Sequence, residues 1–105
     1  MKIVKKKLLR IFTSEEKKYK GKPLYKFILE AAKDEGLKGA TVFRGIAGYG
    51  KEKILRQQGF FELRSSLPVV VEIIDEEEKV RGFLEKIRGI EKELITLEDV
   101  EVIYL

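Results

Sequence analysis

Apolar and polar positions alternate along the first part of the chain and then recur with a helical spacing. Residues 3–13 predict a strand, because Leu9 and Ile11 fall on one of its faces and Leu8 and Phe12 on the other. The polar segment 13–22 is expected to be a connection. A helix is predicted from Pro23 to a C-terminal cap at Gly36, with apolar residues at i, i+3, i+4 and i+7: Leu24, Phe27, Ile28 and Ala31.

The second part of the chain repeats the alternation of strand and helix. A second strand is predicted over residues 40–47, and the β-branched run "LPVVVEIID" over residues 67–75 predicts a third. Asp75 and Glu78 resemble a capping box at the start of a second helix. That helix carries one apolar stripe: Val80, Phe83, Leu84, Ile87 and Ile90. Residues 99–105, "DVEVIYL", alternate as a last strand.

This order of elements, βαββαβ, predicts an α+β domain of the ferredoxin-like type over residues 1–105. In that fold two helices cover one face of a four-stranded antiparallel sheet. The first and third predicted strands, however, carry apolar residues on both faces, which is typical of strands buried on both sides. In so short a chain the second cover has to come from another copy, so the pattern predicts an oligomer.

The composition narrows the chemistry. The chain has no Cys and no His, so it lacks a thiolate nucleophile, the commonest metal ligand and the commonest general base at neutral pH. We therefore expect neither catalysis nor a metal site, with one open alternative: Glu98, Asp99 and Glu101 as ligands of a divalent cation. The acidic run 75–78 is explained by a helix N-terminus. Abundant Lys and Glu without Asn suit a thermophile.

Charge is distributed unevenly along the chain. Residues 1–22 hold nine Lys or Arg and two Glu (9 − 2 = +7), whereas residues 67–105 hold five basic and eleven acidic residues (5 − 11 = −6). A basic front half can attract an anion, and the acidic back half argues against a surface built for nucleic acid. No apolar run approaches the ~18 residues of a membrane span. We expect a cytoplasmic protein that is not embedded in a membrane.

The stretch "GIAGYGKE", residues 45–52, reads as a nucleotide-binding P-loop except that Glu52 stands where Ser or Thr would hold magnesium. The segment after it also shows no helical stripe, which argues against a true P-loop. Two interpretations stay open. Gly45, Gly48 and Gly50 let the second strand leave the sheet, or their bare N–H groups form a nest for an anion flanked by Arg44 and Lys51.

Four segments of the chain together resemble the small PII-like proteins of bacteria and archaea: "YKGKPLYKFILEAA", "GLKGATVFRGIAGYG", "LPVVVEIIDEEEKV" and "LITLEDVEVIYL". The resemblance runs from Leu8 to Tyr104 and implies a ferredoxin-like homotrimer that binds ATP or ADP in the clefts between subunits. By position it implies phosphate contacts at the glycine stretch. The second glycine-lysine loop of PII proteins, and the basic residues of their last strand, have no counterpart here, so Arg88 and Lys92 are candidate substitutes.

The resemblance also implies that residues 51–66 are a mobile loop that contacts a partner, with a membrane transport protein as one hypothesis. The candidate contact residues are Ile54, Leu55, Arg56, Phe60, Phe61 and Arg64. The other function considered is an RNA-binding module, because the RNA-recognition motif shares the βαββαβ order. Its first strand would offer Phe12 for stacking on a base, but the third strand offers neither an aromatic nor a basic residue.

Overall fold

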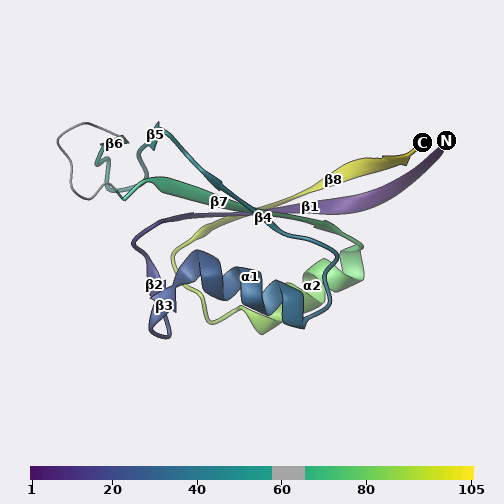
Figure 1. The fold of residues 1–105 in the computed structure, drawn as a ribbon, viewed down its shortest axis with the longest axis horizontal. Coiled ribbons are helices and arrows are strands. Elements are labelled where there is room, and N and C mark those ends of the chain that lie inside the picture. The colour runs from purple at the N-terminus through teal and green to yellow at the C-terminus, as the bar shows by residue number, and fades with distance from the viewer. Residues whose placement is uncertain (58–65) are drawn as a thin grey trace.

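A four-stranded antiparallel sheet with two helices on one of its faces forms the body of the molecule (Figure 1). The computed structural model describes residues 1–57 and 66–105. The strands run in the spatial order β4 (Thr41–Arg44), β7 (Pro68–Asp75), β1 (Lys2–Ser14) and β8 (Leu94–Tyr104). The helices are α1 (Leu24–Asp34) and α2 (Glu77–Lys86). The predicted α+β, ferredoxin-like fold is confirmed.

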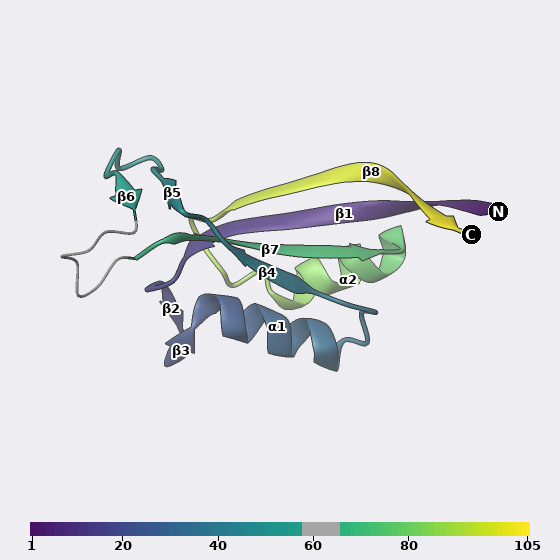
Figure 2. The same cartoon turned by 45° about the horizontal axis from the view of Figure 1, so that its top comes forward.

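Two small hairpins extend this plan at positions where the sequence predicted none. Strands β2 (Lys18–Tyr19) and β3 (Lys22–Pro23) pair within the connection before α1, and β5 (Ala47–Gly48) pairs with β6 (Arg56–Gln57). The predicted second strand therefore ends early, because the chain leaves the main sheet after β4. β1 and β8 are longer than expected and pair from Lys2 and Tyr104 onward. Their paired ends project beyond the helices, where the two termini lie (Figure 2).

The core lies between the sheet and the helices. In β1, Leu9 and Ile11 are fully buried, and they lie opposite Ile73 and Val71 of β7 in the antiparallel register. Apolar residues of both helices close over these four side chains, and those with no exposed surface are Leu24, Ile28, Val80 and Phe83. The helical spacing of the sequence therefore identified these four residues, although Ala32 is buried as well and α2 ends at Lys86, before the predicted Ile87 and Ile90.

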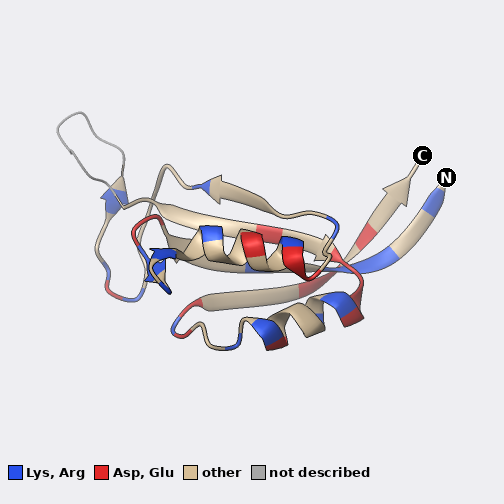
Figure 3. Cartoon of the chain, turned by 60° about the horizontal axis from the view of Figure 1, so that its bottom comes forward, with Lys and Arg blue, Asp and Glu red and all other residues tan. Residues whose placement is uncertain are grey.

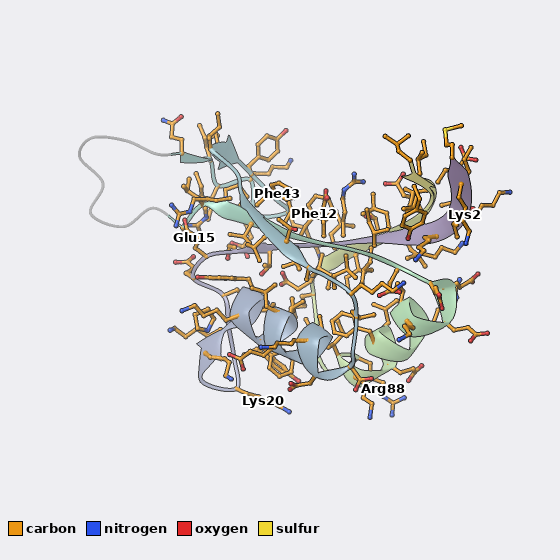
Figure 4. All side chains as sticks on the ribbon, turned by 45° about the vertical axis from the view of Figure 1, so that its right-hand side comes forward. Lys2, Phe12, Glu15, Lys20, Phe43 and Arg88 are labelled. Atoms are coloured by element: carbon orange, nitrogen blue, oxygen red, sulfur yellow. The ribbon has the colours of Figure 1, made fainter. Side chains whose placement is uncertain are left out.

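The opposite face of the sheet carries no helix and is apolar at one end. The register places Val70 of β7 directly between Phe12 of β1 and Phe43 of β4. Phe12 and Phe43 are labelled side by side on the sheet in Figure 4, away from the helices. Phe43 keeps 52% of its surface exposed and Leu94, opposite Phe12, keeps 63%. The prediction of apolar residues on both faces is therefore confirmed for this end of the sheet, and the oligomer expected from it remains a proposal.

Asp75 does not form the predicted capping box. Helix α2 begins at Glu77 with Glu76 as its N-cap, and no side chain caps it. The carboxylate of Asp75 is fully buried and accepts two backbone hydrogen bonds, from the N–H of Lys38 at 2.9 Å and from that of Glu76 at 2.8 Å. Asp75 therefore joins the end of β7 to the connection between α1 and β4. This tertiary partner is invisible to a local sequence pattern.

The stability of the protein is expected to depend on Asp75 below about pH 4, where carboxyl groups ordinarily titrate. Burial alone would raise the pKa of this carboxyl, but the hydrogen bonds from Lys38 and Glu76 and the charges of Lys38 and Lys6 outweigh burial and lower it. A lowered pKa in the folded state stabilises the protein above the ordinary pKa, and this stabilisation disappears as pH falls through the folded value. Asp75→Asn should cost about 1–3 kcal/mol of unfolding free energy at pH 7.

Denaturant unfolding at pH 7 and at pH 3 measures this contribution. The difference between wild type and Asp75→Asn should shrink at the lower pH. Asp34→Asn, at an exposed position near the end of α1, is the matched control and should change little. If Asp75→Asn lowered the free energy of unfolding equally at both pH values, the expected role of the Asp75 charge would be contradicted.

Candidate functional site

The glycine stretch passes directly against Pro68 at the beginning of β7. The N–H of Gly45 donates to the carbonyl oxygen of Pro68 at 2.7 Å. A Cβ on Gly45 would lie 2.8 Å from Cγ of the Pro68 ring, and one on Gly48 would lie 3.1 Å from the same atom. A Cβ on Gly50 would meet nothing within 4 Å. The first interpretation of the glycines is therefore confirmed for Gly45 and Gly48, which let the chain leave the sheet.

Several cationic side chains surround this stretch. Arg44 precedes Gly45 and its side chain is 64% exposed, while Lys51 lies exposed in the turn that follows Gly50. Arg56 of β6 faces the same stretch across the hairpin, because it pairs with Gly48. The N–H of Gly45 is bonded to Pro68 and Gly48 is paired with Arg56, so an anion would meet the other N–H groups of the stretch, next to guanidinium and ammonium groups. The nest hypothesis for Gly45, Gly48 and Gly50 stays a prediction.

Within one chain, Arg88 does not lie near the other candidate anion-binding residues of the glycine stretch. It follows α2 and contacts Glu85 at 3.4 Å, on the helix side of the sheet (Figure 4). The next residue, Gly89, lies against Tyr19 of the β2–β3 hairpin, since a Cβ there would be 2.7 Å from the tyrosine hydroxyl oxygen. The glycine stretch lies at Pro68, on the other side of the sheet. Grouping Arg88 with it was an inference from the resemblance alone.

The strand geometry separates the candidate ligands of the divalent-cation alternative, because Glu98 points to the opposite face from Asp99 and Glu101. Glu98, Asp99 and Glu101 belong to β8, and neighbouring residues of a strand point to opposite faces. Accordingly Glu98 pairs with Arg10, and Asp99 pairs with Lys7, whose hydrogen bond and charge lower the pKa of Asp99. Among the residues that the structure describes, no three acidic side chains lie close enough together to hold a metal ion.

A second cationic feature, which the sequence did not reveal, lies at the other end of the sheet. A cavity of about 300 Å³ is lined by Lys2, Val4, Lys6, Lys38, Glu76 and Tyr104. Its lining thus includes three lysines, one tyrosine and a single acidic residue. Lys6 keeps only 8% of its surface exposed. We call this feature the lysine pocket. The alternation of Lys2, Val4 and Lys6 on one face of the first strand was the available signal.

Basic residues therefore occupy both ends of the molecule. Figure 3 shows Lys and Arg on the N-terminal part of β1 and on β6. Figure 4 labels Lys2 at one end of the sheet and Glu15, next to the glycine stretch, at the other. The helix-free face of the sheet between these two ends is not basic, because Arg10 at its centre is paired with Glu72 and Glu98. Carboxylates at that position disfavour the RNA-stacking alternative.

The predicted partner loop is described in part. Ile54 and Leu55 are exposed, at 51% and 63%, whereas Arg56 is placed in β6 and contacts Glu16. Ile46 and Tyr49, which were not predicted, are more exposed still, at 80% and 74%. The remaining candidates lie outside the described residues: Phe60, Phe61 and Arg64. Exposed apolar side chains therefore lie within the glycine stretch itself as well as in the predicted partner loop.

The fold is that of PII-like proteins, and comparisons with known proteins agree. Residues 6–102 match the family model DUF190, described as an uncharacterized ACR, and the chain belongs to this family. A UPF0166 protein of Aquifex aeolicus (strain VF5) is 70% identical over 105 residues, which cover the whole of both chains.

Two solved structures show the same fold. One is CPII, a nitrogen regulatory PII-like protein from Thiomonas intermedia K12, bound to ADP, AMP and bicarbonate; its TM-score is 0.71, with 19% identity over 96% of this chain and 91% of that one. The other is a putative PII-like signaling protein (TTHA0516) from Thermus thermophilus, with a TM-score of 0.70 and 22% identity over 98% of this chain and 94% of that one. The fold expected from the sequence is thus confirmed as PII-like.

Within residues 1–57 and 66–105, neither helix is long and apolar enough to cross a membrane.

Proposed function

We propose that this chain is a PII-like regulatory protein, a homotrimer that senses an adenine nucleotide, ADP or ATP, between its subunits. One observation carries the proposal: the glycine stretch and the lysine pocket, both cationic, lie at opposite ends of the same sheet. No recognisable nucleophile–base pair accompanies either feature, and we therefore propose a sensor rather than an enzyme.

A ring of copies brings the two ends together. When identical chains associate head to tail and the rotation closes, one end of each chain meets the other end of the next chain. The apolar surface around Phe43 and Val70 would then face the neighbouring copies at the centre of the ring. Burying such a surface is favourable by about 25 cal/mol for each Å² of apolar area. The proposed ligand site lies at each boundary between chains.

The two ends that meet at each boundary between chains would bind the nucleotide through different groups. N–H groups around Gly45 to Gly50, with Arg44 and Lys51, would bind phosphate oxygens from one chain. Lys2, Lys6 and Lys38 of the next chain would supply the cations that PII proteins carry in their last strand. A cavity of about 300 Å³ in a single chain is at the lower end of ligand pockets, so a nucleotide needs both chains.

Isothermal titration with ADP tests the proposal. The double variant Lys6→Gln, Lys38→Gln removes two ammonium groups from the pocket and should weaken ADP binding by about tenfold or more, because charge-assisted hydrogen bonds are worth ~1.5–3 kcal/mol each. Lys33→Gln, an exposed lysine of α1, is the matched control and should bind as the wild type does. Equal affinity in both variants would contradict a role for the lysine pocket, and no binding at millimolar ADP would reject the nucleotide.

We further propose that the surface beside the glycine stretch contacts the regulated partner. Ile46, Tyr49 and Leu55 expose apolar side chains on one hairpin, a type of surface that marks interaction sites when it is contiguous. A membrane transport protein is the partner class that the family resemblance suggests, met from the cytoplasmic side. Nucleotide bound at Gly45 to Gly50 would alter the hairpin that presents these residues.

A further inference from the structure

Two consecutive glutamates after β1 hold both stems of the glycine-rich segment. The Oε2 atom of Glu15 lies 3.1 Å from a guanidinium nitrogen of Arg44, at the end of β4. The Oε1 atom of the same carboxylate accepts the N–H of Leu67, at the start of the returning stem, at 3.3 Å. Glu16 contacts Arg56 of β6 at 3.2 Å. One short turn therefore binds the outgoing stem, the returning stem and the hairpin between them.

Backbone contacts fix this turn in position. The N–H of Glu15 donates to the carbonyl oxygen of Leu67 at 3.0 Å, and that of Glu16 donates to the hydroxyl of Ser66 at 3.4 Å. Leu67 and Ser66 are buried, at 3% and 7% exposure. The two carboxylates thus project from a turn fixed by backbone hydrogen bonds toward the partly exposed side chains of Arg44 and Arg56. We call the set of Glu15, Glu16, Arg44 and Arg56 the glutamate clamp.

The clamp occupies the same cations that a phosphate group would need. Arg44 directly precedes the glycine stretch and Arg56 pairs with Gly48, and each already faces a carboxylate. Both ion pairs are open to solvent, since the Arg44 side chain is 64% exposed and that of Glu16 is 63% exposed. Exposed ion pairs contribute little net stability, so a multiply charged anion can compete for the arginines.

We infer that the glutamate clamp is an autoinhibitory contact: Glu16 holds the β5–β6 hairpin through Arg56, Glu15 holds the end of β4 that leads into the hairpin through Arg44, and an anionic phosphate ligand releases both by taking over the two arginines. The inference rests on the proposed function for the identity of that ligand. In this account, ligand binding changes the position of the exposed residues Ile46 and Tyr49 by breaking the contacts of the glutamate clamp. Glu15 and Glu16 are positioning residues and need not touch the ligand.

Hydrogen–deuterium exchange over residues 45–57 tests the clamp without any ligand. In Glu15→Gln and Glu16→Gln the exchange there should be about threefold faster or more, because a released segment opens locally more often. Glu30→Gln breaks an ion pair of similar exposure with Lys22, on the helix side of the molecule, and should leave exchange at 45–57 unchanged. Unchanged exchange in both clamp variants would overturn the inference.

Titration with ADP and with inorganic pyrophosphate tests the competition. Loss of the competing carboxylate should tighten binding by about threefold or more in the clamp variants, and ligand should speed exchange at residues 53–57 in the wild type, beyond the N–H groups of the glycine stretch that it would cover. Binding in the wild type without any change in exchange would overturn the clamp and leave the sensor proposal in place. Loosening by pyrophosphate in a chain that does not bind ADP would reject the nucleotide and support the clamp.

Discussion

Phe43→Asp is expected to run as a single chain of 12.2 kDa under conditions in which the wild type runs at three times that mass. Phe43 lies on the edge strand β4 beside Val70 and leaves half of its surface exposed in one chain. A carboxylate at this position would have to be buried without a partner in the trimer, and that cost exceeds what a few apolar contacts return. Light scattering coupled to size exclusion at micromolar concentration measures the mass.

The partial exposure of Phe43 also makes the test interpretable. Because the side chain contributes little to the core of one chain, Phe43→Asp should keep its far-UV circular dichroism and remain folded as a monomer. Phe43→Leu keeps an apolar side chain and should remain trimeric. A trimer for Phe43→Asp, or a wild type that is already a monomer, would contradict burial of the helix-free face.

Gly45→Ala is expected to destabilise the protein by about 1–3 kcal/mol, the usual cost of forcing an extra methyl group into a packed site. The new Cβ would lie 2.8 Å from Cγ of Pro68. A proline ring cannot rotate away as a flexible side chain would, so the backbone must move, and with it the hydrogen bond from Gly45 to Pro68. Denaturant unfolding measures the loss, and ADP titration should show weaker binding.

The three glycines form a graded series for this prediction. Gly48→Ala should cost less than Gly45→Ala, since its Cβ would lie 3.1 Å from the proline ring, and Gly50→Ala should cost almost nothing in open space. Pro68→Ala removes the obstructing Cγ atom, so the double variant should recover most of the loss of Gly45→Ala. Equal costs at Gly45 and Gly50, or no recovery in the double variant, would show that Pro68 is not the cause.

Periodic patterns predicted the body of the fold because burial acts on every turn of a helix and every second residue of a strand. Leu24 and Ile28, or Val80 and Phe83, must face the sheet, and their spacing records it. The doubly apolar character of the first and third strands was likewise readable, and it corresponds to Leu9 and Ile11 on one face and Phe12 on the other. Each of these patterns is carried by many residues, so it remains recognisable in the sequence even where single positions depart from it.

Features that depend on a few tertiary contacts could not be predicted in this way. The buried Asp75 resembled a capping residue because its actual donor, the N–H of Lys38, is 37 positions away. The lysine pocket joins both termini and Lys38, and no local pattern links them. Arg88 was grouped with the glycine stretch by family position, whereas the structure places it beside Glu85. The two small hairpins depend on two-residue strands too short to show a period.

The central claim, a ligand site shared by two chains, is tested most directly by mixing two variants that are each deficient in one half of it. Arg44→Gln, Lys51→Gln removes cations from the glycine stretch, and Lys6→Gln, Lys38→Gln removes cations from the lysine pocket. Subunits refolded together form mixed rings in which one boundary unites the two intact halves. Random mixing should then restore wild-type affinity for ADP at about a quarter of the sites per chain, although each variant alone binds about tenfold or more weakly. Mixed rings that bind no more ADP than the separate variants would contradict a site between subunits.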